Sequence, residues 1–403
     1  MSPNFEQRVL IIGAGATGLL IAQSLRKLGI ACTVFERDAS LDARPRDWNF
    51  SLHWANSVLK DCLPDDLSLD IIRQQAGVDD DIPSADEVLP VINLATGEFM
   101  TKIPAPFIVR LQKQKLRRVL SQGVDIKFAK RLVSLHSDGS TVIAIFEDGS
   151  KEEGQLLIGA DGAHSKVREF LLGPEKASVE PSPIVACRMS TSLPADAALQ
   201  LRKLHPRNLM AIGPSGILVW MSAHDCRDAN PSKWIFTVAQ SWIPGSTTAK
   251  ANGEPEYPGQ EKIVQIMNQR AQLFAEPLRS IWSSIPNDAP AFYGQLNFWI
   301  TDKWDNRDGT ITLAGDSAHA MTFHRGQGLN NAVQDVATLV SSLQQCVSTP
   351  NRFKSALEIY EPEVWVRGRE AVLSSNKNSE ALMSWESVKE SLLFTKGFRN
   401  KVD

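Results

Sequence analysis

The feature of the sequence that most constrains the fold is a glycine pattern close to the N-terminus. Gly13, Gly15 and Gly18 follow a short β-branched apolar run and open a helical pattern of apolar residues. A second apolar run then ends at Glu36, about 20 residues beyond the glycines. This order predicts a strand, a tight turn, a helix and a second strand that ends in an acid.

Each member of this pattern has a physical role in binding a dinucleotide. Gly13 permits the turn, Gly15 lets the backbone approach a pyrophosphate, and Gly18 lets helix and strand pack closely. The helix N-terminus attracts phosphates, and Glu36 accepts hydrogen bonds from the adenosine ribose. A glycine turn with a purely structural role is the alternative, but the strand context and the acid favour a nucleotide site.

The overall composition is that of an ordinary globular protein. The chain has 403 residues, 43% hydrophobic and 22% charged, so we expect two or three structural units at roughly 100–200 residues each. Lys+Arg 43 against Asp+Glu 46 gives a net charge of −3, which provides no basic field for a phosphate polymer. Nucleic acid is therefore not an expected partner.

The cysteines and the apolar stretches indicate the compartment. The five cysteines are widely spaced without a CxxC pair, so we expect neither a disulfide framework nor a metal site. The longest apolar stretch, 9–22, would span only about 21 Å as a helix, short of the roughly 30 Å hydrocarbon core. Residues 1–7 also lack the pattern of a secretory signal. We expect a cytoplasmic protein without a membrane span.

Two later segments decide between NAD and FAD. Residues 155–168 form an apolar run, a polar turn that contains Asp161, and a helix start. Residues 310–331 form another run that ends at Asp316 and continues to glycines that open a helix. Asp316 is suited to accept hydrogen bonds from a ribityl chain, and the turn amides that follow suit the electron-rich edge of a flavin ring. The sequence therefore predicts a flavin.

With these motifs in this order, the chain resembles the single-component FAD-dependent aromatic hydroxylases of the p-hydroxybenzoate hydroxylase type. The motifs are GAGATG with Glu36, DGAHSKVR, and GDSAH followed by GQGLNNA. Segment 46–54 is similar to one in the fungal secondary-metabolite branch of that family. The resemblance covers roughly residues 8–340 and implies a flavoprotein monooxygenase with non-covalently bound FAD.

The composition of the middle of the chain shifts to strand-like pieces separated by turn residues, which predict an antiparallel sheet beside the nucleotide unit. These pieces are 184–192, 208–212, 216–223 and 234–242. We expect an α/β protein: a Rossmann-like FAD-binding domain with an interleaved antiparallel-sheet substrate domain and a helical C-terminal region. The expected boundaries are 1–80, 101–182 and 291–345 for the FAD-binding domain, 81–100 and 183–290 for the substrate domain, and 346–403 for the C-terminal helices.

The resemblance implies which residues hold FAD. Glu36 binds the adenosine ribose, Asp316 the ribityl–phosphate region, and the turn 326–331 the flavin ring. The DG motif, which contains Asp161, Gly162, Ser165 and Arg168, is taken to serve both FAD and the reduced nicotinamide. The expected cofactor contacts are Gly13, Gly15, Ala16, Thr17, Gly18, Glu36, Arg37, Arg46, Arg110, Lys113, Asp161, Arg168, Gly315, Asp316, Gly326, Gly328, Leu329 and Asn330.

Two positions depart from the family pattern. Lys113 opens the segment where the family has R-x-x-L-R, and Arg110 lies one turn earlier. Whether Arg110 or Lys113 lies over the flavin therefore stays open. A proline common in the third motif is also absent from 320–325, which leaves the shape of the loop on the ring face open.

Four residues are candidates for the substrate side. Trp220 and His324 are candidate substrate contacts. Arg188 and His53 are candidates to hold, polarise or deprotonate the substrate, and Arg188 is suited to an anionic or phenolate-like oxygen. A surface arginine and a hydrogen-bonded structural histidine are the respective alternatives.

The resemblance implies that NAD(P)H reduces FAD, that dioxygen gives a flavin C4a-hydroperoxide, and that one oxygen reaches an electron-rich aromatic or polycyclic small molecule by hydroxylation or epoxidation. No second GxGxxG appears in the sequence, so NADPH or NADH must dock transiently. We expect a monomer or a homodimer without a metal. A flavin oxidase or dehydrogenase, a reductase on the same fold, and a non-catalytic flavin-binding protein are the alternatives.

Overall fold

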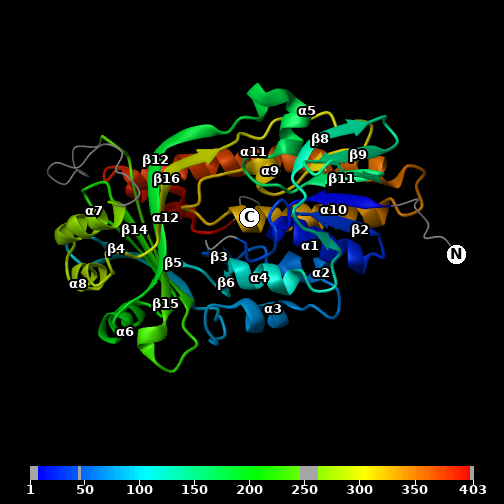
Figure 1. The fold of residues 1–403 in the computed structure, drawn as a ribbon. Coiled ribbons are helices and arrows are strands. Elements are labelled where there is room, and N and C mark those ends of the chain that lie inside the picture. The colour runs from blue at the N-terminus through cyan, green and yellow to red at the C-terminus, as the bar shows by residue number, and fades with distance from the viewer. Residues whose placement is uncertain (1–7, 44–46, 246–261, 400–403) are drawn as a thin grey trace.

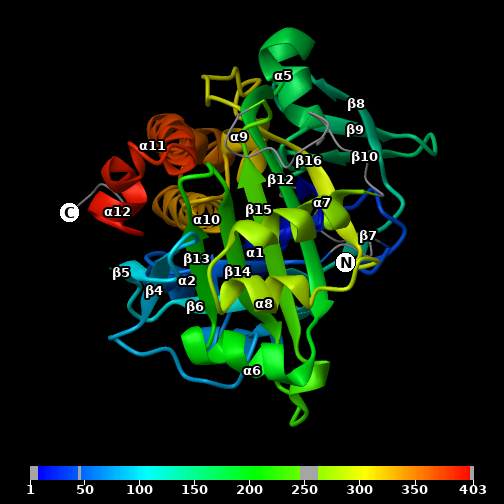
Figure 2. The ribbon, with the colours of Figure 1, turned by 90° about the vertical axis from the view of Figure 1, so that its left-hand side faces the viewer.

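The computed structural model describes residues 8–43, 47–245 and 262–399, which form two main sheets with helices around them (Figures 1 and 2). One is a five-stranded sheet in the order β17-β11-β1-β2-β7, with all neighbours parallel. β1 and β11 are buried at every position, as strands are in a parallel sheet that is covered on both faces. The bounds are β1 Val9–Ile12, β2 Cys32–Phe35, β7 Ile126–Lys127, β11 Leu156–Gly159 and β17 Ile311–Leu313.

The second main sheet has seven strands in the order β16-β12-β15-β14-β13-β4-β5. All its neighbours are antiparallel except β13 and β4, which are parallel. β16 lies in the segment 291–345 that was expected in the FAD-binding domain, yet it pairs with β12 in this sheet. The division into domains stays a prediction. The bounds are β4 Val88–Asn93, β5 Phe99–Pro104, β12 Glu180–Ser192, β13 Asn208–Ile212, β14 Leu218–Asp225, β15 Ile235–Trp242 and β16 Ala291–Phe298.

Two small antiparallel sheets complete the β structure. One pairs β3 with β6, and the other has the order β10-β9-β8. Their bounds are β3 Asn49–Leu52, β6 Val109–Gln112, β8 Leu132–Ser137, β9 Val142–Phe146 and β10 Lys151–Gly154.

The helices cover the two main sheets. α6, α7 and α8 lie on the outer face of the seven-stranded sheet, in front of it in Figure 2. The long helix α11 packs against α10 near the five-stranded sheet (Figure 1). The bounds are α1 Ala16–Lys27, α2 Asn56–Cys62, α3 Leu69–Ala76, α4 Lys113–Leu120, α5 Lys166–Ala177, α6 Ala195–Leu204, α7 Ile263–Arg270, α8 Leu278–Ser283, α9 Asp316–His319, α10 Gly328–Gln345, α11 Arg352–Met383 and α12 Leu392–Lys396.

Buried side chains form three apolar clusters. The first surrounds the five-stranded sheet, and the second fills the space between the seven-stranded sheet and α6–α8. The third lies on the other face of the seven-stranded sheet, where Leu382, Leu393 and Phe398 from the C-terminal region pack against strand residues such as Met210. The C-terminal region therefore lies on the face of the seven-stranded sheet opposite α6–α8.

The predicted α/β class, with a Rossmann-like unit, a largely antiparallel second sheet and C-terminal helices, is confirmed. In the part of the chain that the structure describes, no helix has the length and apolar character that a membrane crossing requires.

Candidate active site

The glycine turn leaves open space at the start of α1. A Cβ added to Gly13 would lie 2.5 Å from the Ala160 carbonyl oxygen. A Cβ added to Gly18 would lie 2.0 Å from the carbonyl oxygen of Gly13. A Cβ at Gly15 would meet nothing within 4 Å. The N-terminus of α1 also has no side-chain cap and no acid in its first turn. Its free amides and this gap fit a pyrophosphate.

Glu36 lies beside this turn at the end of β2. It accepts hydrogen bonds from the backbone amides of Ala14 at 2.8 Å and Asp38 at 3.0 Å. Arg117 from α4 lies 4.0 Å from the Glu36 carboxylate and donates to the Ala14 carbonyl at 2.8 Å. A carboxylate has about four lone-pair sites, so two amides leave acceptor capacity for ribose hydroxyls. Sequence reasoning did not assign Arg117 to the site.

Three further predicted contacts have different positions. Thr17 lies close to Gly315 in the loop that follows β17, because a Cβ added to Gly315 would lie 2.4 Å from the Thr17 hydroxyl oxygen. Arg37 is exposed next to Glu36. Arg46 lies outside the described residues.

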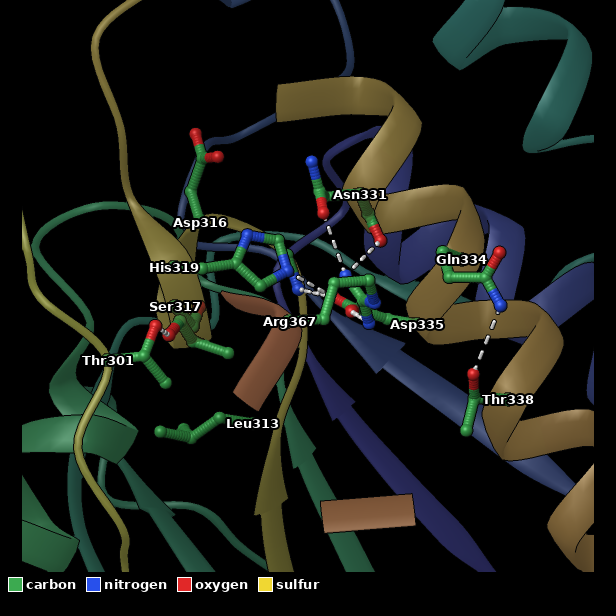
Figure 3. A network of polar contacts seen from close by, with 12 residues as sticks. Thr301, Leu313, Asp316, Ser317, His319, Asn331, Gln334, Asp335, Thr338 and Arg367 are labelled. Carbon is green, nitrogen blue, oxygen red and sulfur yellow. Dashed lines mark hydrogen bonds and ion pairs between the residues drawn. The ribbon is translucent and has the colours of Figure 1, made fainter. Parts of the chain in front are cut away.

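Asp316 lies directly after β17, where Gly315 turns the chain with a φ of 62°. Its side chain is open to solvent on one side and points away from the polar contacts beneath it (Figure 3). Protein encloses its other sides, and this burial raises the pKa of the Asp316 carboxyl, which His319 and Lys113 partly offset. An open acid at the carboxyl end of a parallel strand is suited to a polyol ligand.

A buried network holds the Asp316 loop from below (Figure 3). Asp335 on α10 accepts from the Gly315 amide at 2.6 Å, from His319 Nε2 at 2.7 Å and from Arg367 Nη2 at 2.6 Å. Arg367 comes from α11 and also pairs with Glu363. Burial raises the pKa of Asp335, but His319 and Arg367 outweigh it and the net shift is downward. Sequence reasoning missed Asp335 and Arg367, because no motif spacing marks them.

The DG motif holds the same loop from the other side. Asp161 accepts from the Ser317 hydroxyl at 3.0 Å and from the Lys166 amide at 2.7 Å. Arg168 is 1% exposed and donates to backbone carbonyls, among them that of Ser317 at 2.9 Å. Its guanidinium carbon also lies 4.5 Å from the ring centroid of Trp299. Both motif side chains are thus engaged within the protein, and their service to FAD and nicotinamide stays a prediction.

The geometry separates Arg110 from Lys113. Arg110 lies in strand β6 and not one helical turn before Lys113, which begins α4. Arg110 is buried, donates to the side chains of Asn49 and Ser51, and lies 5.5 Å from the Trp220 ring centroid. Lys113 Nζ lies 3.7 Å from the Trp48 ring centroid and lowers the pKa of Asp316. Arg110 thus lies between β3 and the seven-stranded sheet, whereas Lys113 lies on Trp48 and acts electrostatically on Asp316.

The turn at the start of α10 is tied to β3. Asn330 donates to the Ser51 and Gly326 carbonyls, each at 3.0 Å, and accepts from the His53 amide at 3.0 Å. His53 Nε2 lies 3.1 Å from the Gly326 carbonyl oxygen. Burial lowers the pKa of His53 to about 4. The turn engages Nε2 of His53, whereas its Nδ1 has no hydrogen-bond partner among the described residues. A catalytic role for His53 stays a prediction, with a structural histidine as the alternative. Gly328 and Leu329 begin α10, whose N-terminus has no side-chain cap.

The C-terminal tail, residues 391–399, holds this turn from outside. Arg325 donates to the Gly397 carbonyl at 3.2 Å and to the Arg399 carbonyl at 2.7 Å. The rings of His53 and Phe398 lie 4.9 Å apart. Sequence reasoning gave the tail no part in the site.

Arg325→Ala is expected to loosen the turn 326–330 and to weaken FAD binding about tenfold, because two charge-assisted hydrogen bonds to the tail are lost. Hydrogen exchange of the turn and FAD titration measure the two effects. Arg399→Ala is the control, since only the carbonyl of Arg399 holds Arg325. Equal effects of the two substitutions would contradict this role of the tail.

The candidate substrate side lies between β12 and the loop after α9. The Arg188 guanidinium carbon lies 5.2 Å from the Trp48 ring centroid and 5.3 Å from that of Phe323. His324 is buried, and its Nδ1 lies 2.9 Å from the Ser379 hydroxyl. Burial, with Arg188 adding to it, lowers the pKa of His324 to about 3. The structure thus brings Arg188 and His324 together.

Comparisons with known proteins agree with this geometry. Residues 6–375 match the family described as FAD binding domain. The chain is 45% identical to the FAD-dependent monooxygenase cctM of Talaromyces islandicus, over 100% of this chain and 99% of that protein. It is 32% identical to the FAD-dependent monooxygenase phnB of Penicillium herquei, over 98% and 95% of the two chains.

Solved structures share the fold at lower identity. Klebsiella pneumoniae HpxO complexed with FAD and uric acid has a TM-score of 0.74 at 19% identity, over 98% of this chain and 93% of that chain. The 2,6-dihydroxypyridine-3-hydroxylase of Arthrobacter nicotinovorans has a TM-score of 0.74 at 19% identity, over 95% and 94%.

Proposed function

The chain belongs to the FAD-dependent monooxygenases with an FAD binding domain, and from this premise we propose which of its residues carry the reaction. The enzyme binds FAD, uses NAD(P)H and dioxygen, and transfers one oxygen atom to a small-molecule substrate. We assign the substrate to the electron-rich aromatic or polycyclic compounds of fungal secondary metabolism. A substrate that carries an acidic hydroxyl suits Arg188 and His324.

Three observations support a fit to FAD. The start of α1 offers free amides and the gap at Gly15, the Asp316 carboxylate is open, and the start of α10 is uncapped. We therefore assign the pyrophosphate of FAD to the start of α1, the ribityl chain to Asp316 and the edge of the flavin ring to the start of α10. When bound, FAD supplies hydride acceptance and the activation of dioxygen. Lys113 rather than Arg110 is our assignment for the side chain near the cofactor, because Lys113 acts electrostatically on Asp316, whereas Arg110 is buried and bonded to Ser51 and Asn49.

The observation that carries the proposed mechanism is the buried Nε2 of His324, which is free to accept a hydrogen bond. The Ser379 hydroxyl donates to the Thr322 hydroxyl at 2.8 Å, so it accepts from His324 Nδ1, which therefore bears the proton. A neutral imidazole with a protonated Nδ1 has a lone pair on Nε2. In the described part of the chain Nε2 has no hydrogen-bond partner, although it is buried. We assign it to accept a hydrogen bond from a substrate hydroxyl.

Arg188 complements this acceptor. A hydrogen bond to His324 Nε2 polarises the substrate O–H bond, and the proton stays on the oxygen because burial and Arg188 lower the pKa of His324 to about 3. The guanidinium nearby stabilises the negative partial charge on that oxygen. The more electron-rich ring that results is the better oxygen acceptor. Trp48 and Phe323 hold Arg188 between them, which keeps its position fixed.

The test follows NAD(P)H consumption and labelled dioxygen. Wild-type enzyme should release FAD on denaturation, oxidise NAD(P)H slowly alone, and accelerate with an accepted member of a polyhydroxylated aromatic panel. The product should carry one labelled oxygen atom. Arg188→Ala and His324→Ala should lower the stimulation and increase hydrogen peroxide release, while Arg131→Ala, an exposed arginine paired with Glu147, should not. Product without labelled oxygen would instead indicate an oxidase or dehydrogenase.

Location and assembly remain proposals. We keep the cytoplasm, which the five free cysteines support. We also keep a monomer or a homodimer, to be decided by light scattering of the purified enzyme.

A further inference from the structure

The reductant needs a binding site that the described motifs do not supply. NADH and NADPH carry a pyrophosphate, so they need cations and open space. Arg168 is buried and donates to backbone carbonyls, and Asp161 holds Ser317 and the start of α5. The DG motif therefore offers no open cation.

We propose that the reduced nicotinamide dinucleotide docks through its phosphates in a basic groove between α11, α12 and the end of β5. This proposal rests on the proposed monooxygenase function. The groove has a volume of ≈ 1890 Å³, and α11 and α12 lie side by side at one end of the molecule (Figure 2). We call it the α11–α12 groove; its exposed cations are Lys102, Lys303, Arg369, Lys377, Lys396 and Arg399.

The charge of the α11–α12 groove favours an anion. Eight lysines and arginines line it against three acids, in a chain whose net charge is −3. One of these acids, Glu363, is already paired with Arg367. Across residues 8–43, 47–245 and 262–399, no ion pair joins the six exposed cations to a carboxylate. Arg369 also donates to the Thr301 carbonyl at 3.0 Å, but that acceptor is neutral and Arg369, unlike Arg168, is exposed. The charge of the six cations is thus available to phosphates.

The walls of the α11–α12 groove suit flat rings. Trp54, Trp365 and Phe394 line it and are half-buried. Aromatic faces of this kind stack on nucleobases. His53 and Arg325 are among the buried lining residues of the groove. His53 contacts Gly326 of the turn expected to carry the flavin ring, and Arg325 directly precedes that turn. A dinucleotide in the groove therefore lies next to the turn that it must serve.

A second copy of the chain is a poorer occupant. A two-fold dimer buries the same patch on both subunits, so this groove would face its own excess of positive charge. A mobile anionic cosubstrate meets no such repulsion.

The test reverses two charges in the groove. Arg369→Glu with Lys377→Glu is compared with Arg131→Glu and Lys151→Glu, which change the charge equally on exposed positions near β8 and β10. Loss of flavin absorbance at 450 nm after rapid mixing is followed against NADPH and, separately, NADH concentration. We expect the groove variant to need at least about tenfold more nucleotide for half-maximal reduction, with the limiting rate and FAD content unchanged.

Further measurements separate the possible failures. Titration with NADP⁺ by calorimetry should show the same weakening without turnover, and Lys377→Glu alone serves if the double variant misfolds. Wild-type nucleotide affinity in the groove variants would overturn the site. A changed molar mass with unchanged nucleotide affinity would identify a subunit interface and overturn it too. A wild-type flavin that neither NADPH nor NADH reduces would instead contradict the proposed function.

Discussion

Asp335→Ala is expected to lower the free energy of unfolding by about 3–5 kcal/mol and to abolish tight FAD binding. The carboxylate is completely buried and holds Arg367, His319 and the Gly315 amide at once. Its removal leaves Arg367 with Glu363 alone and takes the buried acceptor away from His319 and the Gly315 amide. The Gly315 amide precedes Asp316, so the same change releases the loop assigned to the ribityl chain.

Chemical denaturation and FAD titration measure the two effects of Asp335→Ala. Gln334→Ala is the matched control, because Gln334 is the preceding residue of α10 and its side chain, among the residues that the structure describes, bonds to Thr338 alone (Figure 3). An Asp335→Ala variant that unfolds like the Gln334→Ala variant would contradict the network. A variant that stays stable but fails to bind FAD would show that Asp335 positions the Asp316 loop and contributes little to the stability of the fold.

Gly18→Ala is expected to destabilise the protein by about 1–3 kcal/mol and to deprive it of FAD, because the new methyl group would lie 2.0 Å from a backbone oxygen that cannot move alone. Gly15→Ala is its counterpart. A methyl group there meets no protein atom within 4 Å but stands where we place the pyrophosphate. It should therefore leave the unfolding transition unchanged and weaken FAD binding about tenfold or more.

Unfolding curves and FAD titration of both glycine variants give a two-by-two result. Both positions belong to the same motif, but only Gly18 is packed against protein. Loss of stability in Gly18→Ala alone, with weaker FAD binding in both variants, would therefore separate the effect on folding from the effect on cofactor binding. Loss of stability in Gly15→Ala, or FAD retention in Gly18→Ala, would contradict the assignment of the turn.

Local patterns were enough to predict the elements that carry the motifs. The apolar run before Gly13 is β1, the helical pattern after Gly15 is α1, and the run before Asp316 is β17. The spacing of apolar residues in these segments and the glycines that end them are local signals, so neighbouring residues determine whether each segment forms a strand or a helix.

Side-chain direction and distant partners were not predictable in this way. Arg110 and Lys113 are three residues apart, but a strand ends and a helix begins between them, so they face different parts of the molecule. Asp335 and Arg367 meet only because α10 packs on α11. Arg325 holds the carbonyl of Arg399 and not its charge, and no residue type signals that contact.

Synthesis on the ribosome releases β1, β2 and β11 long before β17, which begins at Ile311. Because β17 pairs with β11, the apolar edge Leu156–Gly159 stays without its neighbour while the nascent chain passes through β12 to β16, five of the seven strands of the second sheet. Unpaired apolar edges are templates for aggregation, so incomplete chains need chaperones more than the finished enzyme does. FAD, which depends on the loop after β17, can enter only when translation of the cofactor-binding segments is almost complete.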